Sequence, residues 1–532
     1  MNGTPDQFTP DMDVDLAVIG FGKGGKTLVG AMAAAGHRTV LIEHSADMYG
    51  GTCINIGCVP SKTLAYAAEH PDMRLTGQQW FEQAAQRKST LTAAMRAKNF
   101  ELFNSPAQST VITGHARFTG PHSLEVTAGQ DRLTVRANYI VINTGAEPAL
   151  PALDGLNIPD ARQGRGRVLT STSLLALTQR PKSLVILGGG YVGVEFASSL
   201  AQFGTQVTLV QRGPHLLPAY DAAISQEVRD LLTDAGVDVV TSATVQGVND
   251  TGSSVTVSYS AHDGSQGQVT ADYALVALGR SPVTAGLGLQ DVGIVTGKRG
   301  EIVVDEFLRT NLAGVFAVGD VNGGPQFTYI SLDDYRIVLD QLTRADAGVG
   351  LAAVPASGAA RAGAGAQAFA GAVDAGSDAG AGAKADVGAG AGTGAQAGPG
   401  HRGACRSTRD RVAVPQVVFT HPPLAHVGLT LAQAKEAGYE LLWASRRVAD
   451  MPTVPRAKIV GDAAGIMTAV VDAHSIQVLG VTILAHDAHE IINTVALAMR
   501  AHVTANQLRD GIYTHPSMTE AFNDLFAHLS PA

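Results

Sequence analysis

Cysteine is scarce in this sequence, and its scarcity narrows the class of protein. Only three of the 532 residues are cysteines, which excludes a disulfide framework and is typical of a protein from a reducing compartment. Two of them, Cys53 and Cys58, have only four residues between them. In a reducing compartment a close pair of this kind is usually catalytic or metal-binding rather than structural.

Basic stretches and long apolar runs are also missing. The chain has 38 lysines and arginines against 47 acidic residues, a formal net charge of -9, which argues against nucleic acid or an anionic membrane surface as a partner. No uninterrupted apolar run is long enough to cross a bilayer. The first fifteen residues are acidic and lack the apolar centre of a signal peptide. We therefore expect a cytoplasmic protein without a membrane partner.

Large apolar side chains almost disappear between residues 345 and 400, where alanine and glycine predominate. Such a segment cannot bury enough surface to offset the entropy lost on ordering. We therefore expect a disordered insertion over residues 345–411. Cys405 lies at its edge, and we expect an incidental exposed cysteine there, with a third redox thiol as the alternative.

The cysteine pair belongs to a thirteen-residue string, GGTCINIGCVPSK, at residues 50–62. Gly57 gives the backbone between the two cysteines the freedom to close a small disulfide ring. An accessible and strained pair of this kind is easily reduced. The string predicts a redox-active disulfide, and the alternative is a packing disulfide or two buried thiols.

Residues 14–43 alternate as strand, glycine turn, helix and strand. The first strand covers residues 14–19, the turn GFGKGG covers residues 20–25, and the second strand ends at Glu43. In such a βαβ unit the glycines let the backbone approach a pyrophosphate at a helix N-terminus, and the acid accepts hydrogen bonds from ribose hydroxyls. The residues predicted to bind a dinucleotide here are Gly20, Gly22, Gly25 and Glu43.

The same arrangement recurs later in the chain. A strand at residues 183–187 leads into the turn GGGYVG at residues 188–193, then into a helix and a strand at residues 206–210. Two dinucleotides beside a reactive cysteine pair predict an electron path from a nicotinamide through a flavin to the disulfide. The alternative is that the second unit is only a structural repeat. The glycines predicted to bind the second dinucleotide are Gly188, Gly190 and Gly193.

The last part of the chain, from residue 412, alternates strands and helices and ends in YTHPSMTE at residues 513–520. An imidazole five residues before a carboxylate can be held in one tautomer by that acid and act as an acid or base toward a thiol. We predict that His515 and Glu520 are catalytic. Most of the other histidines are expected to be surface or packing residues.

These motifs together resemble the class I pyridine nucleotide-disulfide oxidoreductases. The resemblance includes the cysteine string, both glycine turns, the segment from Thr310 to Asp320, the GRSP turn at residues 279–282, and His515-Pro516 with Glu520. It covers essentially all of the chain outside the insertion. It implies an α/β fold with two Rossmann-like dinucleotide-binding domains and a C-terminal α+β dimerisation domain. The implied domains are FAD-binding at 13–150 and 285–344, NAD(P)H-binding at 151–284, and dimerisation at 412–532.

The resemblance also implies roles for individual residues. Cys58 would be the thiolate that faces the flavin, and Cys53 the outer, interchange thiol. Lys62 and Glu195 would form a pair beside the flavin, for which two surface charges are the alternative reading. The resemblance further implies that His515 and Glu520 reach the cysteines across a homodimer interface.

Other cofactor contacts are implied in the same way. Tyr191 would shield the flavin until the nicotinamide docks, with a packed aromatic residue as the alternative reading. Asp320 would hold the FAD ribitol. The remaining candidates for cofactor binding are Thr52, Thr144, Gly145, Gly279, Arg280 and Gly319.

Within the family, three segments are similar to the bacterial reactive-chlorine-resistance flavoproteins, which reduce hypothiocyanous acid and have been described as copper(II) reductases. The segments are residues 20–28, residues 326–336 and THPP at residues 420–423. The chain lacks the C-terminal cysteine pair normal in mercuric reductases and the C-terminal thiol or selenol of high-molecular-weight thioredoxin reductases. A disulfide reductase like dihydrolipoamide dehydrogenase or glutathione reductase remains an alternative, and a flavin-bound redox sensor is the alternative without turnover.

The two nucleotide units differ at one informative offset. Glu43 lies eighteen positions after Gly25, whereas the residue eighteen positions after Gly193 is Gln211, followed by Arg212. The absence of an acid removes the usual mark of NADH selection, and Arg212 can offer a charged fork to a 2′-phosphate. We therefore predict FAD and NADPH as cofactors, with NADH as the alternative, Arg212 as a cofactor-binding residue and no metal site. The alternative reading of Arg212 is a solvated surface charge.

Overall fold

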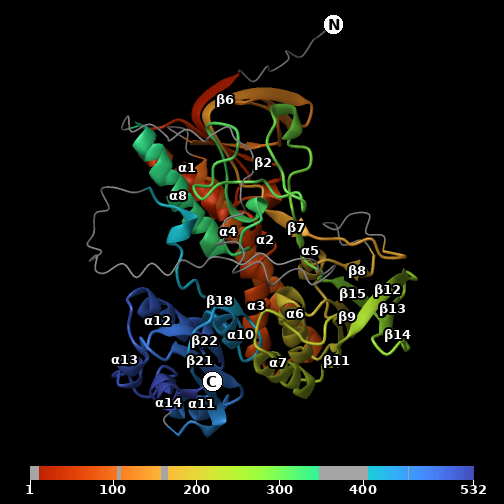
Figure 1. Ribbon diagram of the computed structural model, residues 1–532. Coiled ribbons are helices and arrows are strands. Elements are labelled where there is room, and N and C mark those ends of the chain that lie inside the picture. The colour runs from red at the N-terminus through yellow and green to blue at the C-terminus, as the bar shows by residue number, and fades with distance from the viewer. Residues whose placement is uncertain (1–10, 105–108, 157–165, 347–404, 453) are drawn as a thin grey trace.

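The structure is a computed structural model that describes residues 11–104, 109–156, 166–346, 405–452 and 454–532. Most of the predicted insertion, residues 347–404, lies outside the described residues. In Figure 1 the N-terminal sheet is at the top, the second nucleotide unit is at the lower right, and the C-terminal domain, in blue, is at the lower left. The helix that follows Cys58 runs between these regions.

The N-terminal sheet has seven strands, in the order β3-β2-β1-β6-β5-β4, with β17 also paired to β6. Its parallel part is buried; β2 is buried along its whole length, as expected for a parallel strand covered on both faces. The first elements are β1 (Met12–Ile19), α1 (Lys23–Ala34), β2 (Thr39–Glu43), η1 (Ala46–Met48), α2 (Thr52–Asn55), α3 (Cys58–Glu69), α4 (Gly77–Phe103), β3 (Ser109–Thr113), β4 (His115–Gly120), β5 (Ser123–Ala128) and β6 (Asp131–Ile142).

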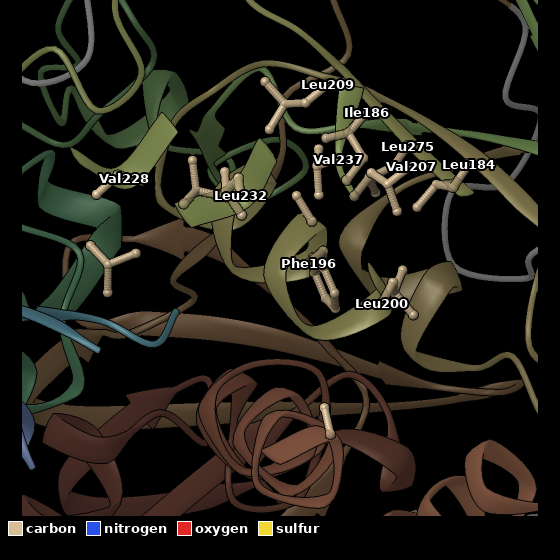
Figure 2. Packing of buried hydrophobic residues seen from close by; sticks show 14 of the residues in the cluster. Leu184, Ile186, Phe196, Leu200, Val207, Leu209, Val228, Leu232, Val237 and Leu275 are labelled. Carbon is tan, nitrogen blue, oxygen red and sulfur yellow. The ribbon is translucent and has the colours of Figure 1, made fainter. Parts of the chain in front are cut away.

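A second parallel sheet has the order β11-β10-β9-β15-β8. Alternate residues of its strands point to one face, where Leu184, Ile186, Val207 and Leu209 pack against Phe196 of α6 (Figure 2). The antiparallel sheet β12-β13-β14 packs on the other face. The elements are β8 (Val168–Leu169), α5 (Ser171–Leu175), β9 (Ser183–Leu187), α6 (Tyr191–Gln202), β10 (Gln206–Val210), α7 (Ala222–Asp234), β11 (Asp238–Val240), β12 (Ala243–Asp250), β13 (Val255–Ala261), β14 (Gln266–Ala271) and β15 (Tyr273–Val276).

The segment by which the chain leaves the first sheet lies beside the segment by which it returns. Strand β7 (Ala146–Pro148) on the way out pairs antiparallel with β16 (Arg280–Pro282) on the way back. After η2 (Gln290–Val292), strand β17 (Val315–Ala317) joins β6 in the first sheet. The short helix η3 (Gly319–Asn322) and helix α8 (Thr328–Asp346) follow, and α8 packs beside α1 (Figure 1).

The C-terminal domain is an antiparallel sheet, in the order β18-β19-β22-β21-β20-β23, with helices packed on it. The strongly apolar strand β21 is buried over almost its whole length. The elements are η5 (Thr408–Asp410), β18 (Gln416–Val418), β19 (Leu424–Gly428), α10 (Leu431–Glu436), β20 (Leu441–Arg447), η6 (Val448–Asp450), α11 (Pro455–Ile459), β21 (Ile466–Asp472), β22 (Val478–Leu484), α12 (Ala488–Arg500), α13 (Ala505–Arg509), α14 (Ala521–Ala527) and β23 (Ser530–Pro531). The predicted fold class, two Rossmann-like units and a C-terminal α+β domain, is confirmed.

The end of the predicted insertion differs from the prediction. Residues 405–411, expected to be disordered, include η5 and contact acidic residues of α8. The side chain of Arg411 makes ion pairs with Asp333, at 2.8 Å, and with Asp334. Composition did not reveal this because the ordering comes from two carboxylates far away in the sequence. None of the helices in the described ranges is long and apolar enough to cross a membrane.

Candidate active site

Cys53 and Cys58 lie on two consecutive helices. Cys53 is the second residue of α2, and Cys58 is the first residue of α3, which has 12 residues. Gly57 lies between them, and a Cβ atom there would be 2.9 Å from the carbonyl oxygen of Thr52, so the turn needs a glycine. Both cysteines are free thiols. Because Cys58 is at the positive end of the α3 dipole, its thiolate form is favoured.

The two thiols differ strongly in acidity. A hydrogen bond from Cys53 lowers the pKa of Cys58 to about 6, and Thr328 and the charge of Lys62 act in the same direction against burial. The hydroxyl of Thr328 is 3.5 Å from the sulfur of Cys58. The same bond between the thiols, together with burial, raises the pKa of Cys53. The pair therefore shares one proton, which Cys53 holds, and Cys58 carries the negative charge.

Lys62 and Glu195 form the predicted pair. The ammonium of Lys62, one turn after Cys58 on α3, donates to a carboxylate oxygen of Glu195 on α6 at 2.6 Å. The other oxygen of Glu195 accepts a hydrogen bond from the backbone NH of Phe419 at 2.9 Å, and the ring of Phe419 lies 4.8 Å from the ammonium. These contacts join all three structural units beside the cysteines, so the two residues are not independent surface charges.

Tyr191 begins α6 and lies in a cluster of aromatic residues. Its hydroxyl donates to the side-chain oxygen of Gln416 at 2.7 Å and is 3.2 Å from the hydroxyl of Tyr220. The ring centre of Tyr191 is 6.3 Å from that of Phe327, the residue before Thr328. The side chain predicted to shield the flavin is thus held within reach of the segment that contacts Cys58.

The first glycine loop fits the diphosphate of a dinucleotide. Gly20 has a φ of +97°, and a Cβ atom there would be 2.4 Å from the carbonyl oxygen of Asn143. Gly22 is the N-cap of α1 and provides no side-chain cap, so the positive end of the helix is available to an anion. The backbone NH of Gly25 donates to the side chain of Asn143 at 2.9 Å, which fixes the loop against the end of β6.

Glu43 and Gln211 occupy equivalent positions in the two nucleotide units. The carboxylate of Glu43, at the end of β2, accepts from the backbone NH of Phe21 at 3.0 Å. The side-chain oxygen of Gln211, after β10, accepts from the backbone NH of Gly189 at 2.9 Å. Each side chain therefore supports its own glycine loop, which justifies comparing them as ribose-side residues. Arg212, the next residue, is exposed to solvent.

The second glycine loop is built like the first. Gly188, Gly190 and Gly193 lie between β9 and the first turn of α6. Gly190 is the N-cap of α6 without a side-chain cap, and no described atom lies within 4 Å of where its Cβ would be. This space in front of the helix N-terminus fits a second diphosphate.

Five further candidates lie near the ribbon of β7 and β16. The hydroxyl of Thr52 is 3.9 Å from the position that a Cβ of Gly145 would take. The hydroxyl of Thr144 donates to a backbone oxygen after β16 at 2.6 Å. The guanidinium of Arg280, which follows Gly279, donates to a backbone oxygen of β7.

Gly319 and Asp320 begin η3. The backbone NH of Gly319 donates to the carboxylate of Asp334 on α8 at 2.6 Å, so Asp334 supports this turn. Burial raises the pKa of Asp320 to about 6, and the charge of Arg280 opposes this shift. An acceptor group at this position is suited to a ribitol hydroxyl. Together with the first glycine loop, the residues present fit FAD.

His515 and Glu520 are paired at the far end of the C-terminal domain. Nδ1 of His515 lies 2.8 Å from the carboxylate of Glu520, which also accepts from the backbone NH of Ser517 at 2.8 Å. Against the effect of burial, these two bonds hold the pKa of Glu520 below its usual value. The imidazole is 69% exposed. The contacts of His515 within the described part of the chain are thus to its own domain.

Several residues of the site were not predicted. Asn143 directly follows the buried end of β6, where ligand-side residues of a parallel sheet are expected, and this signal was available in the sequence. Thr328 and Gln416 carry no local signal, because their partners Cys58 and Tyr191 are far away in the chain. Lys26 lies in residues 20–28, one of the segments that carry the family resemblance, but the sequence predicts no role for it.

Comparison with known proteins agrees with this geometry. Residues 14–334 match the family pyridine nucleotide-disulphide oxidoreductase, and residues 414–526 match its dimerisation domain. The chain is 39% identical over 511 residues to the probable pyridine nucleotide-disulfide oxidoreductase RclA of Escherichia coli K12, covering 96% of this chain and 98% of that one. It is 32% identical over 519 residues to a mercuric reductase of Streptomyces lividans, covering 95% and 94% of the two chains.

A solved structure is also similar. The Cu(II) complex of the HOCl-induced flavoprotein disulfide reductase RclA from Escherichia coli matches with a TM-score of 0.78 and 38% identity, covering 97% of this chain and 99% of that chain. The similarity extends across both nucleotide units and the C-terminal domain. The chain therefore belongs to the pyridine nucleotide-disulfide oxidoreductases, NAD(P)H-dependent flavoprotein enzymes with a redox-active disulfide.

Proposed function

We propose that this enzyme uses NADPH and FAD to reduce hypothiocyanous acid through Cys53 and Cys58, as a cytoplasmic homodimer in defence against oxidative stress. The observation that carries the proposal is the placement of two free thiols on consecutive helices, with Cys58 at the N-terminus of α3 and 3.5 Å from the hydroxyl of Thr328. This arrangement favours a thiolate on Cys58 and leaves the proton on Cys53. The similar protein from Escherichia coli is described as HOCl-induced, which supports an oxidant of the same chemical class.

The cofactors are assigned by the residues that fit them. The first glycine loop, Glu43 and Asp320 would hold FAD, and the second loop with Arg212 would hold NADPH. Bound FAD supplies two-electron transfer between the nicotinamide and the disulfide. Lys62 and Glu195 would orient one another beside the flavin, and Tyr191 would exclude solvent from the flavin site.

The two thiols react with the oxidant in sequence. His515 of the partner subunit accepts the proton of Cys53, and the Cys53 thiolate attacks the sulfur of hypothiocyanous acid. A bond between the two sulfurs forms, the sulfur–oxygen bond breaks, and the hydroxide leaves with the proton from His515 as water. The Cys58 thiolate then attacks the sulfur of Cys53, thiocyanate leaves, and the disulfide is formed. The two thiols have lost two electrons, and the oxidant has gained them.

Copper(II) is a second candidate substrate. The observation that favours it is the solved Cu(II) complex of the similar Escherichia coli protein. Thiolates bind and reduce copper(II) readily, because sulfur is a soft ligand that favours the cuprous state. Copper would then be a substrate of this chain and not a resident cofactor.

One substrate panel tests these proposals. NADPH and NADH consumption is measured with hypothiocyanous acid, oxidised glutathione, lipoamide, copper(II) and mercury(II) on the same preparation, with Cys53→Ser as the matched inactive control. We expect the highest kcat/KM for hypothiocyanous acid. Faster turnover of glutathione or lipoamide would contradict the substrate assignment. Consumption of one nucleotide per enzyme without further turnover would indicate a sensor.

A further inference from the structure

Lys26 is a buried lysine that the mechanism above does not use. It lies in the first two turns of α1, and only 7% of its surface is exposed. Its ammonium donates to the backbone oxygen of Gly50 at 3.0 Å and to the side-chain oxygen of Asn99 at 2.7 Å. Gly50 is the first residue of the cysteine string, three positions before Cys53. The lysine thus connects the flavin-side helix to the turn that positions the redox pair.

The surroundings of this ammonium hold it in place. The side-chain NH2 of Asn99 donates to the backbone oxygen of Met95 at 2.8 Å, which turns its carbonyl oxygen toward Lys26. Both recorded acceptors are neutral, and a buried cation without an anionic partner is unfavourable. Burial and then the neighbouring Lys23 lower the pKa of Lys26 to about 8, whereas the charge of Cys53 opposes this shift. When Cys53 ionises, its thiolate would therefore interact favourably with the ammonium of Lys26.

We propose that Lys26 is a positioning residue for the redox pair, whose buried ammonium stabilises the thiolate of Cys53. This inference rests on the proposed role of Cys53 as the attacking thiol. In the resting dithiol Cys53 holds the shared proton, so its ionisation is the uphill step before attack. A positive charge fixed behind the turn of Gly50 and Gly51 lowers the cost of that step without touching the substrate.

Other charged groups also act on the pair, so the experiment isolates the contribution of Lys26. The groups near Cys53, Cys58 and Lys26 are Lys23 on α1, Asp47 in η1, Lys62 on α3, Arg96 on α4, Glu195 on α6, Arg280 on β16, Asp320 in η3 and Tyr329 on α8. Each of them stays in place in the variants chosen.

The test measures how the alkylation rate of Cys53 depends on pH. Holoenzyme is reduced with dithiothreitol, freed from it by anaerobic gel filtration, and treated with iodoacetamide, and the labelled cysteines are identified by peptide mass mapping. Lys26→Met removes both the charge and the hydrogen bonds, whereas Lys26→Gln keeps a donor and removes only the charge. In both variants we expect the midpoint of Cys53 alkylation to rise by about one pH unit, an about tenfold loss of thiolate at neutral pH.

A second buried lysine gives the matched control. Lys88 on α4 also donates to a neutral backbone oxygen, that of Leu175, and is 6% exposed. Lys88→Met should leave the alkylation midpoint unchanged, and alkylation of Cys405 serves as the internal reference for the reagent. FAD content is measured in every variant from its absorbance.

The possible outcomes separate the explanations. An unchanged midpoint in Lys26→Gln, whatever Lys26→Met does, would show that the lysine only ties the turn to α1, and the proposal would fail. An equal shift in Lys88→Met, or a loss of FAD with an unchanged midpoint, would also overturn it. Because the assay uses neither NADPH nor hypothiocyanous acid, its result does not depend on the proposed substrate.

Discussion

At the residue scale, the most consequential difference in this enzyme is that between its two cysteines. Both lie near Thr328, but only Cys58 lies at the start of a 12-residue helix and within the influence of the charge of Lys62. The hydrogen bond from Cys53 is the largest cause of the acidity of Cys58. Removing one thiol therefore changes the charge of the other.

The first prediction concerns the thiolate of Cys58. In two-electron-reduced enzyme we expect a long-wavelength charge-transfer band between this thiolate and the flavin. Since the pKa of Cys58 is lowered to about 6, the thiolate persists above that pH, and the band should disappear as the pH falls through about 6. The measurement is an anaerobic absorbance titration.

Two variants sharpen this prediction. Cys53→Ala removes the hydrogen bond to Cys58, so the midpoint of the band should move upward, whereas Cys53→Ser keeps a donor and should move it less. Cys58→Ser should lose the band, and each serine variant should lose turnover while retaining FAD. A band that survives in Cys58→Ser would show that the roles of the two thiols are reversed.

The second prediction concerns nucleotide choice at Gln211 and Arg212. We expect a higher kcat/KM with NADPH than with NADH. In Arg212→Ala the NADPH value should fall about 10- to 100-fold, the worth of a charge-assisted hydrogen bond. NADH preference in the wild type, or an alanine variant with unchanged NADPH efficiency, would contradict the assignment.

A control for this prediction uses the contact of Gln211 with Gly189. Gln211→Glu keeps an acceptor for the backbone NH of Gly189 and adds only a negative charge. This variant should favour NADH, because the carboxylate repels a 2′-phosphate and binds free ribose hydroxyls. Comparing kcat/KM for both nucleotides separates the charge effect from damage to the glycine loop.

At the element scale, the short segment at residues 405–411 supports the predicted flavin site. Arg411 pairs with Asp334, which in turn accepts from Gly319 in the turn that carries Asp320. Arg411 is 16% exposed and Asp334 is 1% exposed. The turn predicted to hold the ribitol is thus supported by an arginine that comes from a different part of the chain.

The third prediction is that Arg411→Ala destabilises the flavin domain. The variant leaves Asp334 buried without its cation, which should lower the free energy of unfolding by about 3–5 kcal/mol. FAD should also dissociate more readily. Both are measured by denaturant titration followed by the flavin fluorescence that appears on release.

Arg409→Ala is the matched control for Arg411→Ala. Arg409 comes from the same segment, but it is 74% exposed and its partner is Glu306 at 2.6 Å. Exposed ion pairs contribute about 1 kcal/mol or less, so this variant should unfold nearly like the wild type. Equal losses in the two variants would show that the segment as a whole, and not the buried pair, supports the turn.

At the scale of the whole molecule, we propose that a second subunit completes the site. Figure 1 shows α14, which follows His515, in the C-terminal domain, away from α2 with Cys53. The C-terminal domain matches the dimerisation domain of the family. In the proposed homodimer, an isologous interface would place each C-terminal domain against the other subunit, so that two complete sites would form together.

The fourth prediction follows from this shared site. His515→Ala and Cys53→Ser homodimers should each be inactive toward the oxidant. When the two are unfolded and refolded together, half of the dimers are mixed, and each mixed dimer has one intact site, so about a quarter of wild-type activity should return. Each variant unfolded and refolded alone serves as a control. No recovery despite mixed dimers would show that His515 acts on its own chain or not at all.

Much of the fold and of the site could be predicted from the sequence, because the decisive motifs are local. A glycine turn between a strand and a helix, and two cysteines around Gly57, place all their functional atoms within a few residues. The geometry of these turns depends on backbone conformations that only certain residues adopt. The amino-acid sequence by itself therefore determined the two Rossmann-like units and the cysteine pair, and its family motifs indicated the pair of Lys62 with Glu195.

Only the tertiary structure showed which distant residues contact the side chains of those motifs. Gln416 meets Tyr191, Thr328 meets Cys58, and Arg411 meets Asp334, each across a long separation in sequence. Lys26 was visible within a motif, but its burial beneath the cysteine turn depends on how α1 and α4 pack. Contacts between groups far apart in the sequence depend on distance and solvent exposure, which are set when distant segments pack together, and no local pattern encodes them.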